Sequence, residues 1–253
     1  MIWKVIGQSV IGTSHIQTGK TCEDASSFRI IPLDNDEEAL VAFVSDGAGS
    51  AAFAARAAEE AVLKSIEFAA TLVESESKFE NGSIRALAEQ VYDHIESLAM
   101  DEQVPKNEFS CTLLGFVLLS KKSIFLQIGD GAIITGDDDG FFTPVWWPHN
   151  GEYQNTTTFL IDDPNLPNLK IKVTDAPVRE IALFTDGLQM LALNNETESV
   201  HQPFFEALFP LLRKATTSEH TSILNSRLID YLSGNSINAR TDDDKTLLLA
   251  SRK

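Results

Sequence analysis

The order in which strand-like and helical segments follow one another constrains the fold of this chain more than any other feature. Apolar and β-branched runs predict strands at residues 2–11, 27–31, 39–45, 111–119, 123–129, 132–136, 141–146, 169–173, 180–185 and 245–251. Apolar residues at helical spacing predict helices at about 50–72, 83–99, 202–214 and 219–232. This order lacks the regular strand–helix alternation of a parallel α/β sheet. It predicts an α+β fold in which helices pack outside antiparallel sheets.

Short connections join the predicted strands between residues 111 and 146. Strands joined by tight turns pair antiparallel, so we expect hairpins in this block. The acidic sequence GDDDG at 136–140 is interpreted as the tip of one hairpin. It lacks the alternating acids and the later Glu of a calcium-binding EF-hand loop.

The chain is strongly acidic, with a formal net charge of -17 over 253 residues. Nucleic acids and anionic membranes would repel such a surface, which argues against both as partners. Cys22 and Cys111 are too few for a disulfide framework. The N-terminus lacks the apolar segment of a signal peptide, and no apolar run approaches the roughly 20 residues that span a bilayer. These features predict a cytoplasmic protein.

Residues 1–253 show no linker, repeat or low-complexity tract that would split them, which predicts a single domain. Residues 146–169 form a long stretch with Pro and Asn and with little periodicity. A connection of this length inside a compact domain is usually functional, so we expect a flap there.

Carboxylates stand at the ends of several apolar strands. Asp46 and Asp186 each follow an apolar run and precede a glycine, while Glu23-Asp24 and the run 242–244 add further acids. One alternative is that Asp46 and Asp186 cap the following helices. Several carboxylates gathered at one rim would repel one another unless a cation lay among them. Mg²⁺ and Mn²⁺ prefer this oxygen-only ligation, and the adjacent glycines would let a backbone carbonyl or water approach.

Five short motifs occur in the order found in the metal-dependent protein phosphatase family, the type 2C serine/threonine phosphatases. They are EDA at 23–25, SDGAGS at 45–50, IGDGA at 128–132, FTDGL at 184–188 and DDKT at 243–246. The segments GTSHIQTGKTCEDA and GEYQNTTTFL resemble a bacterial branch of that family. The resemblance covers nearly the whole chain and implies a four-layer α-β-β-α sandwich of two antiparallel sheets flanked by helices.

The resemblance also implies the residues of a metal site. Asp46 would bridge two metal ions, and the carbonyl of Gly47 would be a further ligand. Asp186 and Asp243 would bind the first metal, and Asp130 would complete a third, weaker site shared with Asp186. Glu23 and Asp24 would hold the waters of the second metal. Asp242 and Asp244 match less well and are interpreted as solvated neighbours.

The chain departs from the family pattern at two positions. Ala48 stands where many members have the His or Met of Asp-Gly-His/Met-Gly-Gly, which removes one candidate general acid. Gly19 stands where many members place an Arg that grips the substrate phosphate. His15 or Lys20 could take that role, and the alternatives are a structural histidine near a strand end for His15 and a solvated surface charge for Lys20.

The implied reaction is hydrolysis of a phosphoserine or phosphothreonine phosphomonoester in a protein substrate, one regulated by a kinase. Two Mn²⁺ or Mg²⁺ ions, with a third as an option, would share a water and lower its pKa, and the resulting hydroxide would attack phosphorus. Asp46, Asp186 and Asp243 would be the essential side chains. Two alternatives stay open at this point. One is a weak or inactive phosphatase-like protein that binds a phosphoprotein or regulatory partner, and the other is an acidic binding domain whose aspartates are helix caps.

Overall fold

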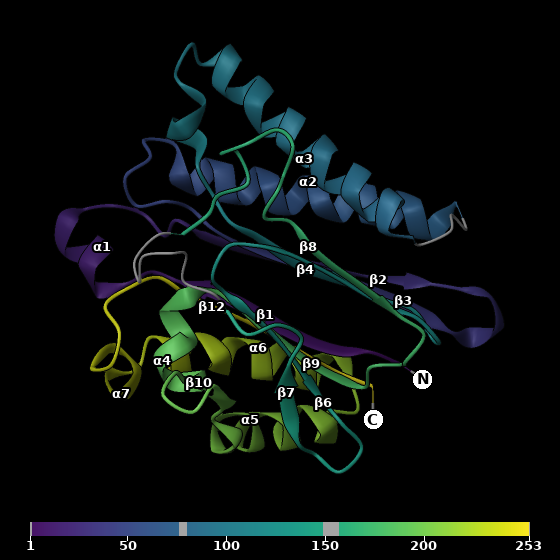
Figure 1. The fold of residues 1–253 in the computed structure, drawn as a ribbon. Coiled ribbons are helices and arrows are strands. Elements are labelled where there is room, and N and C mark those ends of the chain that lie inside the picture. The colour runs from purple at the N-terminus through teal and green to yellow at the C-terminus, as the bar shows by residue number, and fades with distance from the viewer. Residues whose placement is uncertain (1, 76–79, 149–156, 253) are drawn as a thin grey trace. The chain divides into compact units, whose positions relative to one another are not determined.

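The computed structural model describes residues 2–75, 80–148 and 157–252, and the chain divides into two compact units. Unit 1 consists of Met1–Cys22, Gly131–Trp147 and Val178–Lys253, and unit 2 consists of Glu23–Asp130 and Pro148–Pro177. Each unit contains one five-stranded antiparallel sheet with helices packed against it (Figure 1). The predicted fold class, α+β with two antiparallel sheets flanked by helices, is confirmed.

The sheet of unit 2 has the strand order β2-β3-β4-β5-β8. Its strands are β2 (Asp24–Pro32), β3 (Glu38–Asp46), β4 (Leu113–Leu118), β5 (Ser123–Ile128) and β8 (Lys170–Thr174), and its helices are α2 (Ala54–Glu74) and α3 (Asn81–Asp101). The two helices lie side by side over one face of this sheet (Figure 1). Small side chains at Ala57, Ala58 and Ala61 are fully buried, which lets the backbone of α2 approach the sheet closely. This packing anchors the segment that follows β3.

The sheet of unit 1 has the strand order β1-β12-β9-β6-β7. Its strands are β1 (Lys4–Val10), β6 (Ala132–Gly136), β7 (Phe142–Pro144), β9 (Glu180–Phe184) and β12 (Lys245–Ser251). Its helices are α1 (Thr13–Thr18), α4 (Gln189–Ala192), α5 (Gln202–Lys214), α6 (Ser218–Leu232) and α7 (Asn235–Asn238), with a small hairpin of β10 (Leu193–Asn194) and β11 (Ser199–Val200). Phe142, Phe205 and Phe209 form an aromatic cluster, with the Phe142 and Phe209 rings stacked at 5.0 Å. This cluster joins α5 to the sheet.

The hairpin prediction for residues 111–146 is right in two places and wrong in one. β4 pairs with β5, and β6 pairs with β7 through the acidic turn, where Asp137 N–H donates to the Phe141 carbonyl. β5 and β6 do not pair, because they belong to different sheets. Gly129, in the loop between them, has a φ of 115°, a backbone conformation that favours glycine, and Asp130 follows it.

The predicted flap at residues 146–169 falls partly outside the part of the chain that the structure describes. Within residues 157–169, Leu160, Ile161 and Leu166 are buried in the core of unit 2. The flap and the single domain over residues 1–253 stay predictions. Over the described ranges, none of the helices has the length and apolar character needed to cross a membrane.

Candidate metal centre

In unit 2, two of the predicted acids face each other at the ends of paired strands. Asp24 begins β2 and Asp46 ends β3, and the two residues stand opposite in the antiparallel register. The register therefore places two carboxylates side by side at one end of the sheet. Asp24 is buried and Asp46 partly buried, so water screens their repulsion only weakly.

The turn after β3 brings Glu23 to the same place. The backbone N–H of Gly47 donates to the Glu23 carbonyl over 3.0 Å, and Glu23 itself is buried. A side chain at Gly47 would collide with the Ala54 carbonyl and would come within 2.9 Å of the Glu23 carbonyl. The glycine is thus required by close packing of the backbone. This packing holds Glu23, Asp24 and Asp46 in one group.

Two threonines fix the positions of the acids in unit 2. The N–H of Asp46 donates to Oγ1 of Thr112 over 2.9 Å, and the N–H of Thr112 donates to the Asp46 carbonyl over 2.8 Å. Oγ1 of Thr157 donates to Oδ2 of Asp130 over 2.5 Å. One carboxylate oxygen of Asp130 lies within 4.8 Å of one from Asp46. Unit 2 therefore brings Asp24, Asp46 and Asp130 together with the backbone of Glu23, and their role as metal ligands stays a prediction.

In unit 1, the segments that carry Asp186 and Asp243 lie in direct contact. Asp186 follows β9, and Asp243 precedes the neighbouring strand β12. A Cβ atom on Gly187 would lie 3.5 Å from Cβ of Asp243 and would overlap the carbonyl oxygen of Asp244. Because residue 187 is a glycine, the acidic loop of residues 242–244 can pack directly against it.

Asp243 has a raised pKa. The main cause is that surrounding protein atoms keep water from its carboxyl group, although the residue retains an exposed face. The charges of Asp244 and Asp242 raise the pKa further, whereas a hydrogen bond from the Asp244 N–H over 2.8 Å lowers it. A nearby cation would stabilise the ionised form of a carboxylate whose charge is disfavoured in this way.

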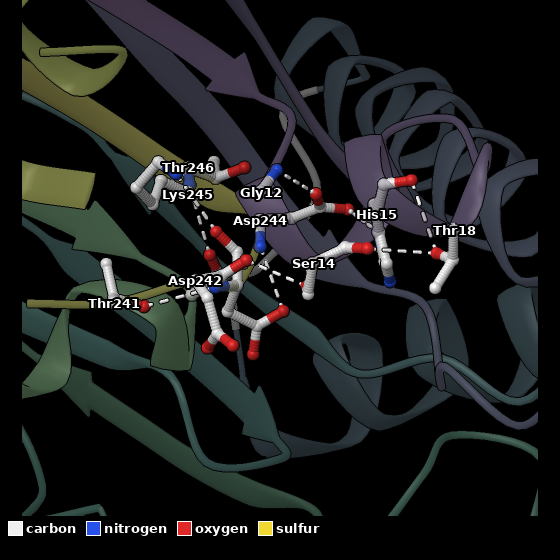
Figure 2. A network of polar contacts seen from close by, with 11 residues as sticks. Gly12, Ser14, His15, Thr18, Thr241, Asp242, Asp244, Lys245 and Thr246 are labelled. Atoms are coloured by element: carbon white, nitrogen blue, oxygen red, sulfur yellow. Dashed lines mark hydrogen bonds and ion pairs between the residues drawn. The ribbon is translucent and has the colours of Figure 1, made fainter. Parts of the chain in front are cut away.

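The prediction that Asp244 is a solvated residue beside the metal site is wrong. Its side chain is only 2% exposed, and both of its oxygens accept hydrogen bonds, from Gly12 N–H and from His15 (Figure 2). The reason is that Gly12, which lies between β1 and α1, and His15, which lies in α1, pack against the side chain of Asp244. Asp242, by contrast, is exposed, as expected.

The helix-cap alternative for Asp46 and Asp186 is wrong. Helix α2 begins at Ala54, its N-cap residue is Phe53, and Asp46 lies in β3. Asp186 is the first residue of a 3₁₀ turn, Asp186–Leu188, whose N-cap is Thr185 without a side-chain cap hydrogen bond. Neither aspartate has the position that capping requires.

The two candidate phosphate contacts differ in their surroundings. His15 lies in α1 with a 14% exposed side chain, and its Nδ1 is 2.9 Å from Oδ2 of Asp244. Lys20 is exposed and follows Gly19, which ends α1 in the left-handed conformation with a φ of 73°. Whether either side chain contacts a phosphate stays a prediction.

Sequence reasoning missed the residues that support the acids. Thr112, Thr157 and Gly12 hold Asp46, Asp130 and Asp244 through hydrogen bonds between distant chain segments. Signals were available for Gly12 and Thr157, since they belong to the segments GTSHIQTGKTCEDA and GEYQNTTTFL, and the first of these also carries Asp244's other partner, His15.

Comparison with known proteins gives one family for this chain. The family model described as protein phosphatase 2C matches residues 11–233. Serine/threonine-protein phosphatase 3 of Escherichia coli (strain K12) is 33% identical over 251 residues, which are 99% of this chain and 98% of that protein.

Two solved structures share the fold. A bacterial serine phosphatase has a TM-score of 0.60 at 15% identity, covering 100% of this chain and 98% of its own. The catalytic domain of the serine threonine protein phosphatase PstP in complex with 2 manganese ions has a TM-score of 0.59 at 16% identity, covering 98% of this chain and 97% of its own. The predicted resemblance to bacterial type 2C phosphatases is thereby confirmed.

Proposed function

Because this chain belongs to the protein phosphatase 2C family and is a metal-dependent serine/threonine phosphatase, we propose which of its residues hold the metal ions. In unit 2 the proposed ligands are Asp46, the Gly47 carbonyl, Asp130, Glu23 and Asp24, and in unit 1 they are Asp186 and Asp243. The family and the relative support this activity over the alternative of a weak or inactive phosphatase-like protein.

The observation that carries the proposal is the pairing of Asp24 with Asp46 in the strand register. Like charges directly opposite in a sheet are destabilising, and this pair is largely removed from water. Asp130 adds a further negative charge close to Asp46, and the backbone of Glu23 lies beside Gly47. Such an arrangement is favourable once a divalent cation compensates it.

The donor set supports Mn²⁺ or Mg²⁺ as the bound ions. All proposed donors are carboxylate or carbonyl oxygens, which hard divalent cations prefer. We propose that Asp46 would be a ligand of two such ions and that Asp130 would hold a third, weaker one. When bound, ions of this kind activate water at neutral pH and neutralise phosphoryl oxygens.

The protein's own residues supply position and charge. Thr112 fixes the backbone on both sides of Asp46, and Thr157 orients Asp130. Lys20 is the better candidate for contact with the substrate phosphate, because Nδ1 of His15 is already engaged by Asp244. The side chain of Lys20 is exposed, so its ammonium group is accessible from solvent.

The substrate is a phosphoprotein, and we propose that its phosphoserine or phosphothreonine is placed by a kinase in the cytoplasm. The net charge of -17 disfavours nucleic acid and anionic membranes as partners. It also favours phosphopeptides in which basic residues flank the phosphorylated position.

The proposal is tested with the full chain, an aryl phosphate and a phosphothreonine peptide. We expect hydrolysis with Mn²⁺ and none after addition of a chelator. Asp186→Asn and Asp46→Ala should abolish turnover while the circular dichroism spectrum is unchanged. Asp93→Asn on the exposed side of α3 serves as the control and should retain activity. Undiminished activity in both site variants would rule out the assigned ligands.

A further inference from the structure

We propose that the segment Gly12–His15 is a clamp that fixes Asp243 in its metal-binding position, with His15 as a positioning residue. This inference rests on the proposed role of Asp243 as a metal ligand. It assigns His15 a role different from the phosphate contact that the sequence suggested.

The clamp closes on the side chain of Asp244. The N–H of Gly12 donates to Oδ1 over 2.5 Å, and Nδ1 of His15 lies 2.9 Å from Oδ2 (Figure 2). An ionised carboxylate can only accept hydrogen bonds, so Nδ1 of His15 carries the proton and donates it to this contact. With both oxygens engaged and 2% exposure, Asp244 is a buried anchor of the loop.

Asp244 passes this restraint to Asp243. Its backbone N–H donates to Oδ1 of Asp243 over 2.8 Å, which fixes one carboxylate oxygen of the neighbouring residue. The Nζ atom of the buried Lys245 donates to the Asp243 carbonyl over 3.0 Å. Asp243 is therefore held at its side chain and at its backbone.

The other end of the acidic loop is bound to the same segment. The N–H and the Oγ of Ser14 both donate to the carbonyl of Asp242, over 2.9 and 2.8 Å. A Cβ atom on Gly12 would collide with the backbone of Asp242 and Asp243. Glycine at position 12 is thus what lets the two segments meet.

The clamp and a role of His15 in substrate binding predict different effects when His15 is replaced. If His15 acts through Asp244, its loss lets the Asp243 carboxylate rotate, and metal affinity falls without substrate present. Residues that orient metal ligands typically contribute about 10–100-fold in affinity. If His15 instead contacts the substrate phosphate, its loss raises KM and leaves metal affinity unchanged.

The experiment measures Mn²⁺ binding to the full chain by calorimetry, without substrate, for His15→Ala, His15→Asn and His15→Gln. We expect His15→Ala and His15→Gln to weaken binding by about 10–100-fold. His15→Asn should remain close to wild type, because its side-chain NH₂ lies near the position of Nδ1 and can donate to Asp244. Rescue by Asn and not by Gln is the signature of this one hydrogen bond, and the comparison holds even if His15→Ala fails to fold.

His94→Ala is the matched control, because His94 makes a similar half-buried contact with Glu60 at 2.8 Å in unit 2. It should leave Mn²⁺ affinity unchanged. Asp243→Asn is measured alongside, and no loss of affinity in that variant would overturn the role of Asp243 and the clamp with it. Weakened binding in Asp243→Asn with unchanged binding in all His15 variants, or a rise in KM alone, would overturn the clamp and leave the proposed metal site standing.

Discussion

Asp24 and Asp46 stand directly opposite each other where β2 and β3 pair, and Asp24 is only 8% exposed. Two like charges in this position cost folding free energy in the metal-free chain. The same pair becomes favourable when a cation lies between the two carboxylates. Stability and the proposed metal binding would therefore make opposite demands on these residues, as is common at functional sites.

Asp24→Asn should stabilise the metal-free chain and weaken its response to metal. Removing one charge of the pair relieves a repulsion of about 0.2–1 kcal/mol. Urea unfolding in a chelator should show this gain, and unfolding in Mn²⁺ should show a smaller stabilisation by metal than in wild type. Asp93→Asn, on the exposed side of α3, should change neither value. A chelator-treated Asp24→Asn chain no more stable than wild type would contradict the argument.

Gly187→Ala should disturb the acidic loop of unit 1. The added Cβ would overlap the Asp244 carbonyl and contact Asp243, so the loop must shift. Overpacking of this kind costs about 1–3 kcal/mol, and we also expect weaker Mn²⁺ binding. Gly82→Ala is the control, because its Cβ would meet nothing within 4 Å. The control should be neutral or slightly stabilising in urea unfolding, and equal behaviour of the two variants would refute the steric account.

Arg213→Ala should destabilise unit 1 strongly. Glu180 is fully buried, and Nε and Nη2 of Arg213 donate to its two oxygens, each over 2.6 Å. Removing the arginine leaves a buried carboxylate without its cation, which costs about 3–5 kcal/mol. In Arg29→Ala the lost partner is Glu74, and both side chains are about half exposed. That variant should lose less than about 1 kcal/mol in the same urea titration, and similar losses in both would contradict the prediction.

The sequence was sufficient for elements with strong periodicity, whereas the metal-binding roles of the acids in the motifs stay predictions. The strand at 245–251 and the helix at 202–214 were predicted with the bounds that β12 and α5 have. Helix α1 was missed because its six residues include none that is buried, so no apolar pattern marks it. The hairpin predicted between β5 and β6 does not form, because the two strands belong to different sheets. The short loop between them does not reveal this.

The environment of Asp244 was the part of the site that sequence reasoning could not reach. In the run 242–244 all three residues are alike, and nothing local distinguishes the buried one from its exposed neighbours. Its partner His15 lies 229 positions away in the chain. A contact of this kind arises only when β1 and β12 pair and bring the segments that flank them together.

Cys111 should resist thiol reagents while the chain is folded. The residue is fully buried, and burial is the main cause that raises the pKa of its thiol from 9.0 to about 12, with the charge of Asp46 adding to the effect. Below pH 9 the thiol is protonated in both states and does not alter stability. Between pH 9 and 12 only the unfolded thiol ionises, which favours unfolding by up to about 1.4 kcal/mol per pH unit.

Mass spectrometry after alkylation of the metal-free chain at pH 8 should show one modified thiol, Cys22, which is partly exposed. Urea titrations at pH 8 and 10.5 should show a steeper loss of stability in wild type than in Cys111→Ala. Rapid modification of both thiols at pH 8, or parallel losses, would contradict the prediction.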